Sequence, residues 1–415
     1  MSRYSLRCRV CQASGPADDR HTCAACLGPL EVVYDFGSGP RGRELRQEIE
    51  SGPHDLWRYR RLLPVEQPAD PGAVGWTPLQ RAERLGARLG LRALYLKNDT
   101  VNPSLSFKDR VVAVAAQKAR EFGYRTIACA STGNLAGAVA AAAARLGLDA
   151  VVFVPSNIEP AKLSVPRIYG ARVVSVDGTY DEVNRLCAQI ADDRRWAFVN
   201  FTLRPYYVEG SKTLLFETAE QLGWRLPDAL VIPIASGALF VNTAKAAREL
   251  MESELVARTT VRFFGAQPAG CGPVADAYAA GSAKYTAVRT PATIAHSLAI
   301  GTPADGNQAL AIARESEGAV EATTDDEIIA AIRLVAETEG ILVEPAAGVT
   351  LAAVARLARS GAIDPDGTVV AYLTGNGFKT PEVALPSRDA LIAIAPTLAA
   401  FEAAVPQTNG QLVEA

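Results

Sequence analysis

The sequence predicts an α/β fold with mostly parallel sheets, preceded by a small cysteine-rich knuckle. Strand-like apolar runs alternate with alanine-rich helical patterns through most of the 415 residues, for example at 126–130, 150–155 and 171–176. Such alternation is typical of parallel sheets that helices cover on both faces. Two Cys-x-x-Cys pairs at the amino terminus stand apart from this pattern. A chain of this length is large enough for two domains around one cleft.

The amino-terminal cysteines have the spacing of a zinc-ribbon-like knuckle. Cys8 and Cys11 form one pair, Cys23 and Cys26 the other, and a short polar stretch separates them. This spacing favours four thiolates around Zn²⁺, and because all four positions are filled, the metal would be structural. His21, between the pairs, is an alternative ligand. Disulfides are the other alternative, although the three remaining cysteines are isolated, as in proteins of a reducing compartment.

A lysine lies where a turn-rich loop meets a helical pattern. Lys108 follows the loop 97–104 and precedes the apolar helical pattern at 110–122. Its apolar neighbours Leu105 and Phe107 would partly desolvate the amine, which favours the neutral, nucleophilic form. Such a lysine can form a Schiff base with an aldehyde. The alternative is a solvated lysine in the first turn of a helix.

Three further loops follow strand-like runs and have the composition of ligand-binding turns. They are Ser-Thr-Gly-Asn at 131–134, Ala-Ser-Gly-Ala at 235–238 and Thr-Gly-Asn-Gly at 374–377. The first two precede helical patterns, and the unpaired amides at a helix start bind anions such as phosphate. One such turn alone is common in α/β proteins, because the backbone needs glycine or asparagine there. Together the loops predict a phosphate-binding site.

These segments resemble the pyridoxal-phosphate enzymes of the tryptophan-synthase-β fold, also called fold type II. The resemblance rests on Asn-Pro-Ser-Leu-Ser-Phe-Lys-Asp-Arg at 102–110, Ser-Thr-Gly-Asn at 131–134 and Leu-Thr-Gly-Asn-Gly at 373–377. Within that group the chain is most similar to the threonine synthases, from about residue 57 to about residue 383. Some threonine synthases also begin with a similar knuckle.

The resemblance implies two doubly wound three-layer domains with the cofactor in the cleft between them. A large pyridoxal-phosphate-binding domain would comprise residues 76–97 and 211–395, and a small mobile domain residues 98–210. The knuckle and an extended arm would occupy residues 1–75, and a tail residues 396–415.

The resemblance also implies roles for individual residues. Lys108 would form the internal aldimine and move protons during turnover, and Asn134 would hydrogen-bond the 3′-oxygen of the cofactor. Thr374 would face the ring nitrogen, where a hydroxyl leaves the ring a milder electron sink than a carboxylate would. The cofactor phosphate would be held by the amides of Ala235, Ser236, Gly237, Ala238 and Leu239.

The implied reaction is elimination of phosphate from O-phosphohomoserine and addition of water to give threonine. A buried phosphate dianion needs several donors. The candidates are Ser131, Thr132, Asn200 and Arg204, with Lys212 as a weaker one. Arg204 comes first because a guanidinium fork matches phosphate oxygens.

The chain departs from the family pattern at a few positions. Leu105 replaces a common glycine, Ala235 and Leu239 replace a common glycine and asparagine, and Tyr207 stands where many threonine synthases have arginine. Two alternatives therefore stay open. One is a related replacement enzyme such as cysteate synthase, acting on O-phosphoserine with sulfite. The other is a serine or threonine dehydratase.

Charge and hydropathy bear on the partners. The formal net charge is −3 and basic residues do not form a dense face with aromatics, so we expect no nucleic-acid binding. The most apolar region, 135–155, is interrupted by Arg145 and Asp149, so we expect no membrane span. The amino terminus lacks the apolar core of a secretory signal, which predicts a cytoplasmic protein. The expected partners are a small phosphorylated amino acid and a second copy of the chain in a homodimer.

Overall fold

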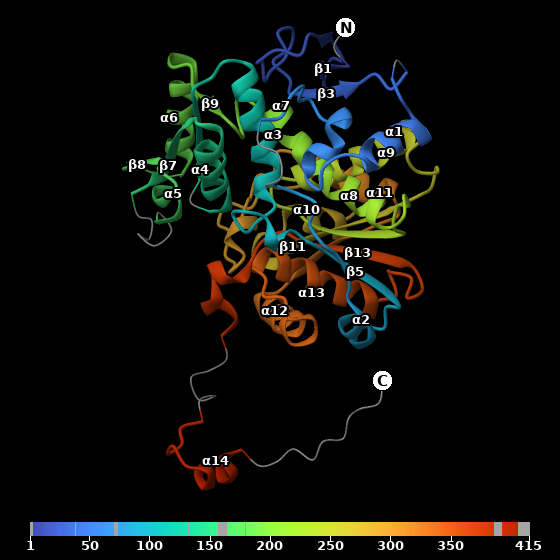
Figure 1. Ribbon diagram of the computed structural model, residues 1–415, viewed down its shortest axis with the longest axis vertical. Helices are drawn as coiled ribbons and strands as arrows, with labels where there is room; N and C mark the ends of the chain where they lie inside the picture. Colours follow the sequence, from blue (N-terminus) through green and yellow to red (C-terminus); the bar gives the residue numbers. More distant parts are fainter. Residues whose placement is uncertain are drawn as a thin grey trace.

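The computed structural model describes residues 3–37, 39–69, 74–131, 133–156, 164–178, 180–385 and 392–405. Within these residues the strands form three sheets, and helices pack on both faces of the two larger ones (Figure 1). This arrangement confirms the predicted α/β class with mostly parallel sheets and a separate amino-terminal knuckle.

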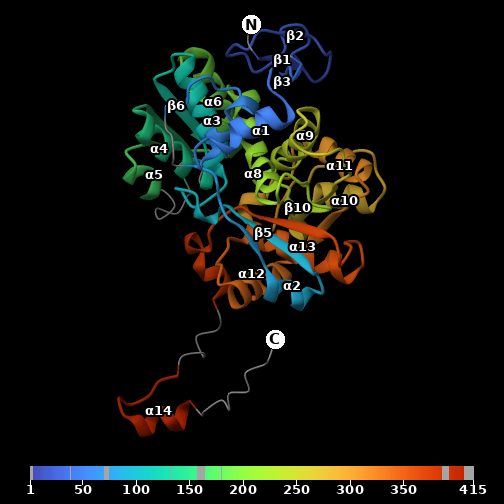
Figure 2. The same cartoon turned by 45° about the vertical axis from the view of Figure 1, so that its right-hand side comes forward.

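The knuckle is an antiparallel sheet at the top of the molecule in Figures 1 and 2. β1 (Tyr4–Cys8) lies between β2 (Ser14–Gly15) and β3 (Leu30–Tyr34). Leu6 and Val32 are buried and belong to the main hydrophobic core. The knuckle is therefore packed on the body and does not stand alone.

An arm connects the knuckle to the body. It contains α1 (Gly42–Glu50) and the 3₁₀ helix η1 (Leu56–Leu62). Its apolar residues Leu45, Ile49 and Tyr59 are buried in the same core. Burial of this face ties the arm to the large sheet.

The larger sheet has the strand order β12-β11-β10-β13-β5-β4, and every neighbouring pair is parallel except β4 with β5. Its strands are β4 (Leu79–Arg81), β5 (Ala93–Asn98), β10 (Ala229–Pro233), β11 (Arg262–Pro268), β12 (Val320–Thr323) and β13 (Thr368–Leu373). Successive residues of β10 face opposite sides, as strand geometry requires. Leu230 and Ile232 enter one core and Val231 enters the other.

Helices cover both faces of this sheet. One face is covered by α2 (Glu83–Leu89), α12 (Asp325–Glu339) and α13 (Pro345–Arg359). The other is covered by α8 (Thr213–Gln221), α9 (Ala238–Glu252), α10 (Pro273–Ala279) and α11 (Gly306–Glu315).

The smaller sheet is wholly parallel and has the order β8-β7-β6-β9. Its strands are β6 (Thr126–Ala130), β7 (Asp149–Pro155), β8 (Arg172–Val176) and β9 (Ala197–Phe198). α6 (Tyr180–Asp193) packs on one face, where Ala128 and Phe153 are buried. The opposite face packs toward α3 (Lys108–Glu121) and α4 (Asn134–Leu146), with α5 (Ser164–Ile168) beside α4.

The chain leaves the large sheet after β5, builds the small sheet and returns at β10. The remaining elements are η2 (Asp99–Val101), α7 (Arg204–Tyr207), η4 (Val208–Lys212), η5 (Ala269–Cys271), η6 (His296–Leu298), η7 (Gly377–Lys379), η8 (Pro381–Ala384) and α14 (Leu398–Ala404). α14 lies apart from the body in both views (Figures 1 and 2). Of the helices in the described part of the chain, none combines the length and apolar character needed to cross a bilayer.

Candidate active site

The predicted lysine loop and the predicted carboxyl-terminal glycine loop lie against each other. The amide of Phe107 donates to the carbonyl of Thr374 at 2.9 Å, and the amide of Asn376 donates to the carbonyl of Leu105 at 3.1 Å. Because β5 and β13 are parallel neighbours, the loops after their carboxyl ends meet at one edge of the sheet. Lys108, the first residue of α3, is thereby fixed beside this edge.

The Lys108 amine is electrostatically prepared for nucleophilic chemistry. Its side chain is half-buried. Burial, and after it the positive charge of Arg204, lowers the pKa of Lys108 to about 8. The amine also lies 4.7 Å from the centre of the Phe107 ring. A lysine with this pKa has a neutral fraction large enough to attack an aldehyde near neutral pH.

The residue after Lys108 fixes the start of α3. Both the amide and the hydroxyl of Ser104 donate to Asp109 Oδ2, at 2.7 and 2.9 Å. This carboxylate therefore closes the loop onto the first turn of the helix. The turn-rich sequence before Lys108 has a structural role as well as a functional one.

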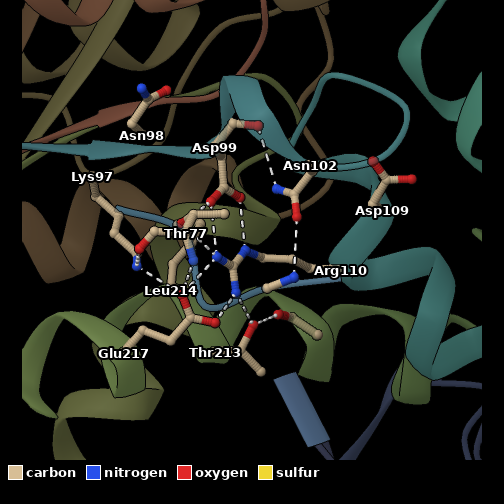
Figure 3. Close-up of polar contacts among 12 residues, drawn as sticks. Thr77, Lys97, Asn98, Asp99, Asn102, Asp109, Arg110, Thr213, Leu214 and Glu217 are labelled. Carbon is tan, nitrogen blue, oxygen red and sulfur yellow. Dashed lines mark hydrogen bonds and ion pairs between the residues drawn. The ribbon is translucent and has the colours of Figure 1, made fainter. Parts of the chain in front are cut away.

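Arg110 anchors the same turn in a buried network of charges (Figure 3). Its Nε donates to Asp99 Oδ2 at 2.7 Å, and its Nη2 donates to Glu217 Oε2 at 2.8 Å. Glu217 also accepts from Lys97 Nζ at 2.7 Å. All four side chains are buried, and their formal charges cancel. Burial alone would raise the pKa of Glu217, but Arg110 and Lys97 hold it at about 2.

Asn134 is the first residue of α4 and contacts two residues from the part of the chain that carries the larger sheet. Its Nδ2 donates to Glu344 Oε2 at 2.7 Å, and Lys379 Nζ donates to its Oδ1 at 2.5 Å. Burial raises the pKa of Glu344. A Cβ at Gly375 would overlap the Glu344 carboxylate, so a larger residue there would displace Glu344 from Asn134. Asn134 is thus held next to the loop that contains Thr374.

The start of α9 has the features of an anion site. Gly237 precedes the helix with a left-handed φ of 91° and has no side chain to cap it. The amide of Ala238 has a long contact with Ser236 Oγ, at 3.5 Å. Asp305 donates its amide to the carbonyl of Ser236 at 2.8 Å, which fixes the loop from behind. β10 and β13 are parallel neighbours, so this loop lies at the same sheet edge as Thr374. An uncapped helix start near a lysine of lowered pKa fits pyridoxal phosphate, which has both a phosphate and an aldehyde.

Arg204, the preferred candidate for substrate phosphate, is the first residue of α7. Its Nη2 lies 2.5 Å from Asp305 Oδ2, and its charge contributes to the pKa of Lys108. Ser131 and Asn200 are half-buried at the ends of β6 and β9. Thr132 lies outside the described residues.

Comparison with known proteins places the chain in a family. The profile of the family described as pyridoxal-phosphate dependent enzyme matches residues 71–375. A threonine synthase from Methanosarcina acetivorans is 35% identical over 385 residues, which cover 92% of this chain and 94% of the relative. A threonine synthase from Methanocaldococcus jannaschii is 32% identical over 391 residues, covering 94% and 96%. The chain belongs to the threonine synthase family. It is a pyridoxal-phosphate-dependent lyase, as the resemblance implied.

Solved structures of this wider group share the fold. Maize serine racemase superposes with a TM-score of 0.62 at 23% identity, over 72% of this chain and 88% of the racemase. Diaminopropionate ammonia lyase from Escherichia coli superposes with a TM-score of 0.64 at 17% identity, over 84% and 94%. These similarities confirm the predicted architecture.

One departure from the threonine synthase pattern has a structural explanation. Leu105 has a φ of 61°, in the left-handed region that favours glycine. The glycine common at this position in the family suits that backbone conformation. Here the hydrogen bonds of the loop to Asn376 and Asn102 hold a leucine in it.

The weaker candidate Lys212 was a wrong prediction. Lys212 is fully buried and lies 2.7 Å from Glu209 and 2.6 Å from Glu249. Its ammonium is committed to these carboxylates and to the carbonyl of Leu62, so it does not bind substrate. Conversely, sequence patterns did not reveal the network around Arg110. Lys97 and Asp99 flank the end of β5, but Glu217 is distant in the sequence.

The four knuckle cysteines come together as predicted. Their sulfur atoms all lie within 4.8 Å of one another, with Cys8 and Cys26 3.5 Å apart and Cys11 and Cys23 3.6 Å apart. Tetrahedral zinc with bonds of about 2.3 Å separates its thiolates by roughly 3.8 Å. The amide of Cys11 donates to Cys8 Sγ at 3.5 Å. The cluster therefore fits a thiolate-bound metal.

Proposed function

We propose that the protein is a threonine synthase that eliminates phosphate from O-phosphohomoserine and adds water to give threonine. The observation that carries the proposal is the Lys108 amine, half-buried, with a pKa of about 8 and with Arg204 close enough to contribute to that shift. A group that can bond an aldehyde and move protons thus lies beside a cation suited to a phosphate.

The cofactor would be held by groups from three loops. Lys108 Nζ would bond its aldehyde carbon, Asn134 would donate to its 3′-oxygen, and Thr374 would face its ring nitrogen. The amides of residues 235–239 would bind its phosphate, which the uncapped start of α9 supports. Once bound, pyridoxal phosphate supplies an electron sink that stabilises negative charge developing on the substrate.

Lys108 Nζ would also move protons at the Cα and Cβ atoms of the substrate. One amine close to both carbons can serve several transfers, and a pKa of about 8 lets it accept and return a proton near neutral pH. Asp109 and Arg110 support this role, because their hydrogen bonds fix the turn that carries the lysine.

The substrate phosphate would be bound by Arg204, Ser131, Thr132 and Asn200. Arg204 has five N–H donors, and Asp305 accepts from one of its nitrogen atoms. Donors therefore remain for phosphate oxygens. Arg204→Ala should raise the KM for the phosphorylated substrate strongly, whereas unchanged kinetics would remove Arg204 from the site.

We also propose that residues 98–210 form a small domain that moves against a large domain of residues 76–97 and 211–395. The smaller sheet β8-β7-β6-β9 supports this division, because its strands lie within residues 126–198 and do not join the larger sheet. Closure would exclude water from the reacting atoms. The knuckle and arm would comprise residues 1–75 and the tail residues 396–415.

The proposal also covers the bound metal, the cellular location and the oligomeric state of the protein. Structural Zn²⁺ on Cys8, Cys11, Cys23 and Cys26 is supported by the close approach of their sulfur atoms. A cytoplasmic location is supported by the three buried cysteines outside the knuckle, Cys129, Cys187 and Cys271, none of which forms a disulfide. The family resemblance supports a homodimer.

The test is an assay of purified holoenzyme with three substrates. We expect O-phosphohomoserine to release phosphate and yield threonine in equal amounts. Cysteate from O-phosphoserine and sulfite, with no threonine from O-phosphohomoserine, would favour the replacement enzyme. Keto acid formed from serine or threonine, without phosphate-dependent activity, would favour the dehydratase.

A further inference from the structure

A residue of the knuckle reaches the region of the active site. Arg9 lies between the first two cysteines, and its amide donates to the carbonyl of Pro29 within the knuckle at 3.0 Å. Its guanidinium extends out of the knuckle, where Nη1 lies 2.8 Å from Asp305 Oδ1. This ion pair joins residues that are 296 positions apart. The metal-binding module and the catalytic body therefore share a charged contact.

Asp305 joins this contact to the cofactor loop. Its side chain is only 5% exposed. It precedes α11 but does not cap that helix, because its two oxygens accept from two arginines, Oδ1 from Arg9 and Oδ2 from Arg204. Its backbone touches the loop before α9, since a Cβ on Gly237 would lie 2.9 Å from the Asp305 carbonyl carbon. Asp305 is thus a buried acceptor, held by contacts on its side chain and backbone, beside the predicted cofactor phosphate.

Arg204 is the third member of this chain of contacts. Its side chain is 30% exposed, so part of the guanidinium is open to a ligand. Its charge also contributes to the lowered pKa of Lys108. Arg9, Asp305 and Arg204 therefore form a continuous chain of contacts from the knuckle to an arginine whose charge acts on Lys108.

We propose that Arg9 is a positioning residue for substrate-phosphate binding, which it assists by occupying one oxygen of Asp305 and so keeping the donors of Arg204 available to the phosphate. This inference rests on the proposed function and assigns the knuckle a part in substrate binding. Arg9 itself does not touch the substrate. The cavity that Arg9, Arg204 and Asp305 help to line is about 30 Å³, room for roughly one water molecule and not for an amino-acid phosphate.

Charge and geometry both support this role. Two guanidinium groups and one carboxylate carry a formal charge of +1, whereas Asp305 and Arg204 alone would be neutral. With Oδ1 taken by Arg9, Asp305 holds Arg204 through Oδ2. Without Arg9, both oxygens could bind the Arg204 fork in the bidentate manner that arginine and carboxylate favour. A dianionic phosphate would then compete with a stronger internal partner for the same donors.

The experiment compares holoenzyme variants at Arg9. Arg9→Gln removes the charge and shortens the side chain, so that its amide no longer replaces Nη1, whereas Arg9→Lys retains the charge and most of the length. Arg7→Gln is the matched control, because Arg7 lies on the same knuckle and pairs with Glu31 at 2.8 Å away from Asp305. For each variant, calorimetry measures the Kd of inorganic phosphate, kinetics measure kcat and KM for O-phosphohomoserine, and elemental analysis measures zinc.

We expect Arg9→Gln to raise the Kd and the KM about tenfold, the change associated with loss of one charge-assisted hydrogen bond. We expect kcat to change little, because the groups that move protons are untouched. Arg9→Lys should recover most of the affinity, and Arg7→Gln should match the wild type. In an Arg204→Ala background, Arg9→Gln should have no further effect, because Arg9 acts through Arg204.

The outcomes separate this inference from the proposed function. Unchanged phosphate affinity in an Arg9→Gln protein of normal zinc content would overturn the positioning role of Arg9. An equal loss of phosphate affinity in Arg7→Gln would also overturn the inference, because the effect would then not be specific to Arg9. If Arg9→Gln loses zinc, the inference is tested by comparing the phosphate affinity of Arg9→Lys with that of the wild type. A tenfold loss of phosphate affinity in Arg9→Lys would overturn the inference. Arg9-dependent phosphate binding in a protein that makes no threonine would overturn the function alone.

Discussion

At the scale of single residues, the decisive property is the pKa of one amine. Lysine in water is almost wholly protonated near neutral pH and is then no nucleophile. Burial lowers the pKa of Lys108 to about 8, and the charge of Arg204 contributes in the same direction. The residue proposed to bind the substrate phosphate therefore also prepares the catalytic lysine.

This dependence predicts how cofactor-free protein reacts with pyridoxal phosphate. Below its pKa Lys108 is protonated, so the rate of adduct formation should rise as pH increases through about 8, well below the ordinary lysine value of 10.5. Arg204→Met should move this midpoint upward, because removal of a nearby positive charge raises the pKa. Borohydride reduction followed by mass spectrometry measures the adduct at Lys108.

The control for this experiment is Arg120→Met, because Arg120 is exposed on the same helix. The pH midpoint of adduct formation in Arg120→Met should equal that of the wild type. A wild-type midpoint near 10.5, or an adduct on another lysine, would contradict the assignment.

At the scale of elements, α3 is held by its first turn. Arg110 makes bidentate contacts with both Asp99, the first residue of η2 directly after β5, and Glu217 of α8 (Figure 3). The helix η4 then packs so closely on this turn that a Cβ at Gly210 would overlap the Arg110 carbonyl. Contacts on several sides therefore fix the position of Lys108.

Removal of Arg110 should destabilise the fold strongly. Arg110→Met leaves two buried carboxylates with Lys97 as their remaining cation, and breaking a buried ion pair in this way costs about 3–5 kcal/mol. Urea unfolding followed by far-ultraviolet circular dichroism measures this free energy. Arg120→Met, at an exposed position of α3, should change it by less than about 0.5 kcal/mol. Similar stabilities of the two variants would show that the network contributes little.

At the scale of the whole molecule, the knuckle is docked on segments from both parts of the body. Tyr206 of α7 donates to the carbonyl of Asp18 at 2.5 Å, and Tyr34 donates to Glu209 of η4 at 2.6 Å. Lys245 of α9 donates to the carbonyl of Val32. With the Arg9–Asp305 ion pair, these contacts place the knuckle across the α7, η4, α9 and α11 region of the protein.

We expect one zinc ion per chain in protein that is purified under reducing conditions without chelator. Removal of the metal should release the knuckle, because its short sheet cannot replace the metal cross-link. Amide hydrogen exchange should then accelerate in β1 and β3, while pyridoxal phosphate still modifies Lys108 in the body. Absence of zinc in native protein, or unchanged exchange after its removal, would contradict a structural metal site.

The sequence by itself predicted the fold class and the pyridoxal-phosphate family, which the comparisons confirm, and it singled out Lys108 and the four knuckle cysteines as candidates. These depend on local patterns: alternating strands and helices, a lysine at a loop–helix junction, glycine-containing turns after strands and paired cysteines. Only the tertiary structure decided which cations are open to a ligand. Lys212 pairs with the nearby Glu209 and also with Glu249, 37 residues away, whereas Arg204 shares an aspartate 101 residues away with an arginine from the knuckle. Ion pairing is a property of distance in space, and local sequence patterns do not contain it.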